Sequence, residues 1–366
     1  MNLTMPAERK LMRPRPVLLV AALILTLAAC STPSPSPSPS SEPSGEPTTS
    51  ASPSGELRQV RLLLGFRPDV QFAPFYLAQQ EGYFADQGLE VTIEHASGGE
   101  LIRLVADGQA EFGVADATDV MIARTSGIPV RYFSTLYRSF PVALIGPAGE
   151  VPADPADLAA SRIGTPGRFG SSWHALLALL KAGALTPDDV TIREYPQFNQ
   201  VEGLLNGDVD LITGFRSNEP LRLAAEGMDN DLLLVDEVAP LPGPGIIAGD
   251  ALLDSDIGLA HAFAAAVALA QEAIVQQPDL GLQAAIGAVP TIAEDEATAL
   301  AVLEATIAVW LGQGPAPSNV VDQAIWCPGY ETMRTLGFID GSVPIEEMVD
   351  IRPVGTMHGD FGCQPG

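Results

Sequence analysis

Aromatic rings stand beside an amide in the stretch DVQFAPFY, which contributes Gln71, Phe72, Phe75 and Tyr76. Aromatic faces stack on planar rings, and each stacked base is worth about 1–3 kcal/mol in proteins that bind single-stranded nucleic acid. An amide both donates and accepts hydrogen bonds, as the mixed edge of a planar heterocycle requires. We therefore predict that these four residues bind a flat ligand. The alternative is that Phe75 and Tyr76 form the inward face of an amphipathic helix.

A second candidate is the glycine-bent stretch TPGRFGSSWH, which should connect a strand to a helix. Backbone N–H groups and the hydroxyls of Ser171 and Ser172 would form a polar cradle at the start of that helix. Such a cradle suits a nitrate, a sulfonate or the hydroxyls of a sugar-alcohol chain. Phe169 and Trp173 flank the cradle and can stack on rings. The alternative is an ordinary helix cap with a core tryptophan, and we expect His174 to be structural.

The stretch GFRSNEP adds an amide and a carboxylate, Asn218 and Glu219, after a third predicted strand. Asn218 can meet an imide edge, and Glu219 can accept hydrogen bonds from hydroxyl or amino groups. A carboxylate that faces the ligand argues against an anionic ligand, because juxtaposed like charges cost several kcal/mol. The alternative is a helix start whose acid stabilises the helix dipole by about 0.3–1 kcal/mol.

Three more residues stand at predicted junctions: Asp116 and Thr118 in VADATDV, and Tyr137 in LYRSFPVAL. We predict that Asp116 and Thr118 point toward the ligand, with helix capping as the alternative for both. Tyr137 lies where the chain should cross between two lobes. There it can close over a ligand, or it can pack in the interior.

Patterns typical of catalysis or metal binding do not stand out in the sequence. It has no Ser/His/Asp order, no Walker loop and no CxxC pair. Its histidines stand far apart in the chain, at His95, His174, His261 and His358. We therefore predict a protein that is not an enzyme and that uses neither a metal nor a cofactor.

The elements that must position these residues follow a regular order. Short apolar runs alternate with helical periods from residue 60, and the same rhythm restarts after residue 142. This alternation predicts βαβ units with mostly parallel sheets. Alanine-rich helices dominate from residue 246 onward.

The sequence thus predicts an α/β fold of two lobes with a ligand cleft between them. We assign residues 57–140 to lobe 1 and 141–243 to lobe 2, and we expect residues 244–366 to return to lobe 1 and end in a helical layer. Ligands of such sheets bind at the carboxyl ends of strands, where the helices begin. The polar and aromatic candidates named above all stand at such junctions.

The N-terminal segment resembles a secretory signal. Basic residues precede an apolar run at 17–29 that ends in Leu-Ala-Ala, directly before Cys30. This order is similar to the lipobox of bacterial lipoproteins, so we predict a signal peptide at 1–29 and a lipid on Cys30. The alternative is a plain signal peptide. The Pro/Ser-rich segment at 30–56 should form an extended, disordered tether.

Charge and cysteine content add two expectations. The formal net charge of −26 argues against nucleic acid and anionic lipid as partners. Besides Cys30, the chain has only Cys327 and Cys363, which in an oxidising compartment can close a loop of about 36 residues. We predict this disulfide, with two buried thiols as the alternative.

Longer stretches resemble a known family. APFYLAQQEGYFADQGLEVTI, DGQAEFGVAD and IARTSGIPV are similar to type II periplasmic binding proteins, in the branch that binds nitrate, sulfonates and thiamine pyrimidine precursors. RPDVQFAPFY and IARTSGIPVRYFSTLYRSFPVAL most resemble the riboflavin-binding lipoproteins of bacterial ABC importers. ITGFRSNEP is similar to both riboflavin and pyrimidine-precursor members.

The resemblance implies a monomeric lipoprotein outside the cytoplasm that binds riboflavin and delivers it to a membrane permease. A thiamine pyrimidine precursor is the alternative ligand. The alternative of another class is a pyrimidine-metabolising enzyme of the same fold. The yeast-type pyrimidine synthases use a cysteine-rich segment and an active-site histidine, and this sequence has no such cysteine run.

Overall fold

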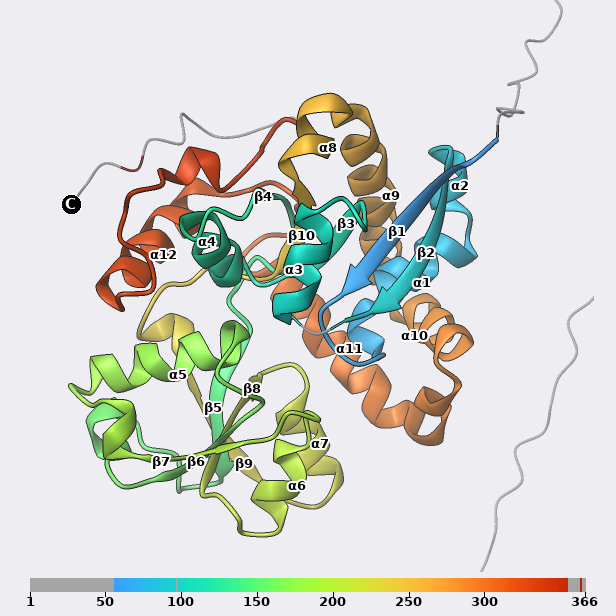
Figure 1. The fold of residues 1–366 in the computed structure, drawn as a ribbon. Coiled ribbons are helices and arrows are strands. Elements are labelled where there is room, and N and C mark those ends of the chain that lie inside the picture. Colours follow the sequence, from blue (N-terminus) through green and yellow to red (C-terminus); the bar gives the residue numbers. More distant parts are fainter. Residues whose placement is uncertain (1–55, 97, 355–362, 364–366) are drawn as a thin grey trace, which may run out of the picture. The chain divides into compact units, whose positions relative to one another are not determined.

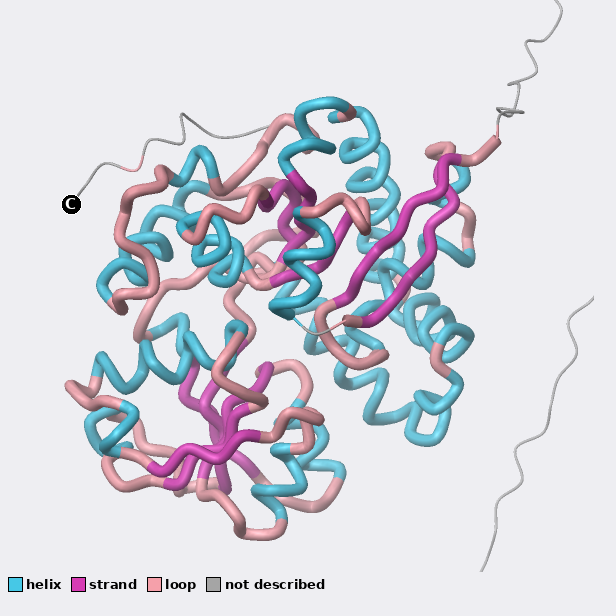
Figure 2. The backbone as a smooth tube through the Cα atoms, in the orientation of Figure 1, coloured by secondary structure: helices cyan, strands magenta, loops and turns pink. Residues whose placement is uncertain are grey.

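A computed structural model describes residues 56–96, 98–354 and 363. The predicted signal peptide, the lipidation at Cys30 and the tether up to residue 55 lie outside the described residues. Two five-stranded sheets, each flanked by helices, form the folded part (Figures 1 and 2). The chain therefore has the predicted α/β architecture.

The first sheet has the strand order β2-β1-β3-β10-β4. Its strands are β1 (Arg58–Leu64), β2 (Leu89–His95), β3 (Phe112–Ala115), β4 (Val130–Thr135) and β10 (Gly245–Gly249). β1 pairs in parallel with β2 and β3, whereas β10 runs antiparallel between β3 and β4. Strand β10 returns to this sheet after the whole second sheet has been formed. The sequence prediction missed it and placed only helices after residue 246.

The second sheet has the order β7-β6-β8-β5-β9. Its strands are β5 (Val142–Pro147), β6 (Arg162–Thr165), β7 (Thr191–Glu194), β8 (Leu211–Phe215) and β9 (Asn230–Leu234). β6 is parallel to β7 and β8, and β5 runs antiparallel to β8 and β9. We call the first sheet with its helices lobe 1, and the second sheet with its helices lobe 2. In each sheet, the first strand formed after the chain arrives from the other sheet (β5 in the second, β10 in the first) lies antiparallel to both of its neighbours.

The helices of the two lobes are short in the α/β part and longer toward the C-terminus. They are α1 (Ala73–Gln80), α2 (Tyr83–Asp86), α3 (Gly98–Ala106), α4 (Ala117–Thr125), α5 (Gly170–Ala182), α6 (Gln200–Leu205), α7 (Glu219–Ala225), α8 (Asp250–Ser255), α9 (Ile257–Gln276), α10 (Pro278–Ala288), α11 (Glu296–Leu311) and α12 (Gln323–Thr335). A 3-10 turn, η1 (Val70–Phe72), precedes α1. α1 and α2 are separate helices, because Gly82 between them adopts φ +78°.

Alternation along β1 explains how the first sheet buries both faces. Leu62 and Leu64 belong to the apolar cluster that includes α1, α9, α10 and α11, whereas Leu63 belongs to the cluster on the side of α3 and α4. Figure 1 shows α9, α10 and α11 beside the β1–β2 half of this sheet. The C-terminal helices therefore cover lobe 1, as a helical outer layer should.

Two crossover segments, 136–141 and 235–244, connect the lobes and lie against each other. The backbone N–H groups of Leu136 and Tyr137 both donate to the carbonyl oxygen of Pro244, at 3.2 and 3.1 Å. A side chain at Gly243 would place its Cβ 2.4 Å from the carbonyl oxygen of Tyr137. The crossing is thus a close backbone contact that requires glycine at this position.

The C-terminal segment extends lobe 1 beyond β4. Val349 forms a parallel bridge with Tyr132 of β4, and the ring of Tyr132 lies edge-on to Trp326 of α12 at 4.9 Å. Cys327 and Cys363 form a disulfide with a Cα–Cα distance of 5.4 Å. The predicted pairing is therefore present in the structure.

Candidate ligand-binding cleft

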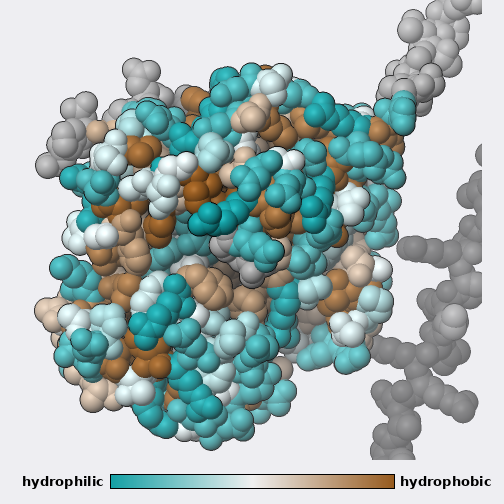
Figure 3. All heavy atoms as spheres, in the orientation of Figure 1, coloured by the Kyte–Doolittle hydropathy of each residue, from teal (hydrophilic) through white to brown (hydrophobic). Residues whose placement is uncertain are grey.

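A cavity lies between elements of both lobes. Figure 3 shows hydrophobic side chains gathered along the boundary between the lobes, on an otherwise largely hydrophilic face. Lobe 1 contributes the loop after β1, η1 and the start of α4, and lobe 2 contributes the starts of α5, α6 and α7. Most of these junctions follow the carboxyl ends of strands, where the sequence placed the site.

Nine of the thirteen residues that the sequence singled out for ligand binding line this cavity. They are Gln71, Phe72, Asp116, Tyr137, Phe169, Ser171, Ser172, Asn218 and Glu219. Each stands within the first turn of a helix, just before a helix, or on a crossover segment. The junction argument therefore named residues that the fold brings together around one cavity.

Phe75 and Tyr76 do not line the cavity, and this corrects the expectation from the sequence. Phe75 is buried in the core of lobe 1 and stacks with Phe263 of α9 at 6.5 Å. The hydroxyl of Tyr76 lies 3.3 Å from Nε2 of His95. Both rings face inward because α1 packs against α9 and α10, so the amphipathic-helix alternative holds for them.

Thr118 and Trp173 also lie outside the lining. The Thr118 hydroxyl is buried 2.8 Å from Nδ1 of His174, and this contact joins α4 of lobe 1 to α5 of lobe 2. The ring of Trp173 packs in the core under the guanidinium of Arg168, at 5.2 Å. Both residues stabilise the arrangement of the helices around the cavity instead of facing a ligand.

His174 is structural, as expected. Its ring lies edge-on to Phe338 at 4.6 Å, and burial lowers its pKa to about 4. The imidazole is therefore neutral near pH 7.

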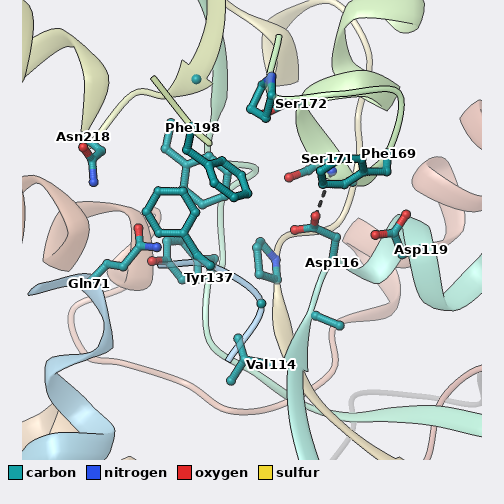
Figure 4. Close-up of a pocket in the computed structure, with 18 of the residues that line it drawn as sticks. Gln71, Val114, Asp116, Asp119, Tyr137, Phe169, Ser171, Ser172, Phe198 and Asn218 are labelled. Carbon is teal, nitrogen blue, oxygen red and sulfur yellow. Dashed lines mark hydrogen bonds between the residues drawn. The ribbon is translucent and has the colours of Figure 1, made fainter. Parts of the chain in front are cut away.

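An amide-rich end of the cavity contains Gln71, Gln200 and Asn218. Figure 4 shows the amides of Gln71 and Asn218 facing each other across this end. Oδ1 of Asn218 accepts a hydrogen bond of 2.6 Å from Nε of Arg222, which leaves Nδ2 buried without a partner among the described residues. Oε1 of Gln200 is likewise buried without a partner in that part of the chain. Buried polar groups are rarely left unpaired, so this end contains one donor and one acceptor whose partners are missing among the described residues.

A carboxyl-rich end lies on the other side of the cavity, where Asp116 and Asp119 stand beside Ser171 (Figure 4). Asp116 does not cap its own helix, because its Oδ2 accepts a 2.8 Å hydrogen bond from the backbone N–H of Ser171 in lobe 2. Burial raises the pKa of both carboxyls, and the charge of Asp116 raises that of Asp119 further. These groups can accept hydrogen bonds from ligand hydroxyls and, when protonated, can also donate.

Glu219 begins α7 and turns back toward its own loop. Its Oε2 accepts a hydrogen bond of 2.7 Å from the backbone N–H of Phe215, and its Oε1 lies 3.4 Å from Nε2 of Gln200. Burial raises the pKa of Glu219 to about 7, against the opposing effect of these backbone hydrogen bonds and of Arg222 and Arg67. The carboxyl therefore changes its protonation state close to neutral pH.

Aromatic rings form the walls between the two polar ends. Phe66 of lobe 1 and Phe198 of lobe 2 meet edge-to-face at 4.6 Å, and Tyr137 meets Phe215 at 6.1 Å. Phe198 adopts φ +56°, a left-handed conformation that costs of order 1–3 kcal/mol for a residue other than glycine. Such strain at a cavity wall is typical of functional positions. Rings on such walls can stack against a flat ligand.

The sequence interpretation missed several lining residues, notably Phe66, Asp119, Phe198, Gln200 and Phe215. Phe198 lies in a turn whose left-handed backbone no residue pattern announces. Phe215 ends β8 and Phe66 follows the end of β1 by two residues, so both stand within a few residues of the predicted sites Asn218 and Gln71. Asp119 is separated from Asp116 by less than one helical turn, the spacing that brings two side chains to one face.

The lining carries acids but no basic side chain among the residues that the structure describes. Three arginines are sequence neighbours of lining residues, but their guanidinium groups have other contacts. Arg168 pairs with Glu194, Arg216 pairs with Asp236, and Arg67 lies over the ring of Phe66 at 5.4 Å. Within the described residues, no group of three or more His, Cys, Asp or Glu side chains is arranged to hold a metal ion. The site is thus acidic, aromatic and rich in amides.

Comparison with known proteins now places the chain. The pattern of the family described as NMT1/THI5 like matches residues 69–280, more than half of the sequence. The chain belongs to the NMT1/THI5-like family. This confirms the recognition made from GYFADQGLEV and its neighbours.

Within and around this family, three similarities stand out. A riboflavin-binding protein of Chloroflexus aurantiacus is 30% identical over 92% of this chain and 97% of its own length. A 4-amino-5-hydroxymethyl-2-methylpyrimidine phosphate synthase of Saccharomyces cerevisiae is 26% identical over 50% of this chain and 56% of its own. The crystal structure of the periplasmic aliphatic sulphonate binding protein of Escherichia coli matches with a TM-score of 0.63 at 12% identity, over 83% of this chain and 94% of that one. This NMT1/THI5-like chain therefore has the periplasmic binding protein fold.

Proposed function

We propose that this protein is the substrate-binding component of an ABC importer and that its ligand is riboflavin. The observation that carries the proposal is the combination of unpaired amide groups, aromatic walls and carboxyls around one interlobe cavity. The similarity to a riboflavin-binding protein over most of both chains supports it. In this account the lobes close on the ligand by hinge motion at the two crossover segments.

The two polar ends suggest how riboflavin would be oriented. The imide edge of its ring system alternates carbonyl oxygens with an N–H group, which suits the free donor of Asn218 and the free acceptor of Gln200. The tricyclic ring would stack against Phe198 and Tyr137. Its hydroxylated chain would then extend toward Asp116 and Asp119, whose carboxyls accept hydrogen bonds from hydroxyls.

The charge of the lining favours this ligand over an anion. A nitrate or sulfonate in the cavity would face Asp116, Asp119 and Glu219 without a basic side chain among the described lining residues. An anion that is desolvated there without a charged partner is disfavoured by several kcal/mol. The sulphonate-binding protein of similar fold shares only 12% identity, so it informs the fold and not the ligand.

A thiamine pyrimidine precursor is the second candidate ligand. The observation in its favour is the similarity to a pyrimidine phosphate synthase, which covers about half of this chain. An aminopyrimidine has the same mixed donor and acceptor edge that the amide end would satisfy. A single ring would, however, lack a polyhydroxylated chain to reach Asp116 and Asp119.

An enzyme of this fold is the candidate from another class. Turnover of a pyrimidine by a synthase of this kind would need a catalytic histidine or cysteine at the cavity. The described histidines near it serve other contacts: Nδ1 of His95 binds the carbonyl oxygen of Phe66, and His174 binds Thr118. Neither residue lines the cavity, which supports binding without turnover.

A panel of ligands tests the proposal. The domain from residue 57 would be heated with riboflavin, a hydroxymethylpyrimidine, nitrate or an alkanesulfonate, and its melting temperature compared with that of the free protein. A ligand that binds the folded protein raises the melting temperature, and at a fixed concentration a tighter ligand raises it more. We expect riboflavin alone to give a large increase, and an increase with the pyrimidine alone would favour the second candidate.

The location follows the same account. We propose that the chain is exported, that Cys30 carries a lipid anchor and that the monomeric protein stays at the membrane beside its permease. The segment at 30–56 would tether the described domain to that anchor.

A further inference from the structure

One ion pair joins the lobes beside the amide end of the cavity. Nη2 of Arg222, in α7 of lobe 2, lies 2.7 Å from Oδ2 of Asp69, which precedes η1 in lobe 1. The Asp69 side chain is 4% exposed and that of Arg222 is 35% exposed. The carboxylate has therefore lost its water in this arrangement, and Arg222 provides its charged partner.

Each member of this pair also holds a residue that lines the cavity. Oδ1 of Asp69 accepts a 2.7 Å hydrogen bond from the backbone N–H of Val70, which fixes the start of the η1 turn that carries Gln71. Nε of Arg222 donates the 2.6 Å hydrogen bond to Oδ1 of Asn218. Arg222 occupies the oxygen of that amide, and the buried nitrogen has no hydrogen-bond partner among the described residues, on the side of Gln71 (Figure 4).

We propose that Arg222 is a positioning residue that holds the Asn218 amide with its N–H groups toward the ligand and, through Asp69, couples this orientation to contact between the lobes. The inference rests on the proposed function, because it assigns Asn218 to the ligand. It adds a role for two residues that do not themselves line the ligand cavity. Closing the lobes and presenting the donor thus become one event.

Physical reasons favour a coupled role over a passive surface ion pair. Exposed ion pairs contribute little to stability, whereas removing one partner of a buried ion pair leaves an uncompensated charge in the protein. Without Arg222, contact between the lobes would bury the Asp69 carboxylate without a charged partner. Contact between the lobes would therefore be disfavoured. The freed Asn218 amide could also rotate and present its oxygen, which an imide carbonyl would repel.

Riboflavin affinity of single and double variants tests the proposal. We expect Arg222→Gln to raise the riboflavin Kd about tenfold or more, since each factor of ten corresponds to about 1.4 kcal/mol. Asp69→Asn keeps the bond between Arg222 and Asn218, so its effect should be smaller. In an Asn218→Ala background, Arg222→Gln should raise the riboflavin Kd no more than Asp69→Asn does. In that background Arg222 has no amide left to orient.

Arg162→Gln is the matched control. It removes the same charge from an ion pair with Asp210 that lies within lobe 2 and away from the cavity. Its riboflavin Kd should equal that of the unaltered protein. Equal Kd values for Arg222→Gln and Arg162→Gln would overturn the proposal.

A second measurement keeps this test separate from the test of the ligand. The radius of gyration of the ligand-free protein, from small-angle X-ray scattering, should increase in Arg222→Gln and Asp69→Asn but not in Arg162→Gln. If the unaltered protein ignores riboflavin, the assigned ligand is wrong, and the scattering comparison still decides whether the pair joins the lobes. Identical radii in all four proteins would contradict the inference.

Discussion

The carboxylate of Asp116 in lobe 1 accepts a 2.8 Å hydrogen bond from the backbone N–H of Ser171 in lobe 2. This bond crosses the cavity at its carboxyl-rich end, as the Asp69–Arg222 pair crosses beside its amide end. It depends on a close approach: Gly170 has φ +68°, and a Cβ there would lie 3.0 Å from Oδ2 of Asp116. Contact between the lobes is thus sensitive to a single methyl group at the start of α5.

The close approach at Gly170 can be tested with an alanine. Gly170→Ala should lower the melting temperature and raise the riboflavin Kd by about tenfold, because its methyl group presses against Asp116. Gly207→Ala is the matched control, since Gly207 has φ +72° but no atom within 4 Å of a Cβ. It should lower the melting temperature through the same backbone strain and leave the Kd unchanged. An unchanged Kd in both variants would mean that this approach is irrelevant to binding.

The raised pKa of Glu219 predicts a pH dependence of stability. A buried carboxyl with a folded-state pKa of about 7 and an unfolded value near 4.3 favours folding below the unfolded value. That contribution is lost as the pH rises toward and through 7. Glu219→Gln lacks this loss and can still accept the bond from Phe215. Its melting temperature relative to the unaltered protein should therefore increase between pH 5 and pH 8.

Melting curves of both proteins at pH 5, 6, 7 and 8 give that difference directly. The comparison cancels the other buried groups, among them Asp116 and Asp119, whose pKa values are raised in both proteins. About 1 kcal/mol corresponds to roughly 2–4 °C for domains of 150–250 residues. A difference that stays constant over this pH range would show that Glu219 is ionised throughout.

The ring of Phe198 should contribute to binding more than to stability. It is partly exposed, lines the cavity and belongs to none of the three described core clusters. Phe198→Ala should weaken riboflavin binding about tenfold, in line with about 1–3 kcal/mol for a stacked ring. Its melting temperature should change little. Phe75→Ala provides the contrast, because the loss of a core phenylalanine costs about 3–5 kcal/mol.

Phe72 and Phe75 show how far a sequence pattern can place aromatic side chains. Phe75 and Phe72 stand three residues apart, so a helical pattern makes both inward-facing. Only the structure distinguishes Phe75 in the core from Phe72 at its edge, where Phe72 also lines the cavity. Gln71, Asn218 and Glu219 were predictable because polar residues at the carboxyl ends of strands converge in this class of fold.

What the sequence could not provide is the pairing of distant residues. The contacts of Asp69 with Arg222 and of Asp116 with Ser171 join positions separated by 153 and 55 residues. Strand β10 was missed for a related reason: its run GIIAG is short, wholly apolar and followed directly by helices. Apolar runs of that length do not distinguish a buried strand from a helix start.

The proposed lipid anchor can be tested apart from ligand binding. In bacterial cells that express the full chain, Cys30→Ser should abolish incorporation of labelled palmitate and move the protein from the membrane to the soluble fraction. Cys327→Ser should keep the label, since that thiol pairs with Cys363 in the described domain. If Cys30→Ser retained the label, the lipid would be attached to a residue other than Cys30.

Fluorescence titration of riboflavin with the purified domain tests the central claim most directly. Flavin emission should be quenched as the ring stacks between aromatic side chains, with saturation at one ligand per protein and a loss of quenching strength in Phe198→Ala. Unchanged emission up to a large molar excess of protein would contradict a cavity that grips a flat, uncharged ring system.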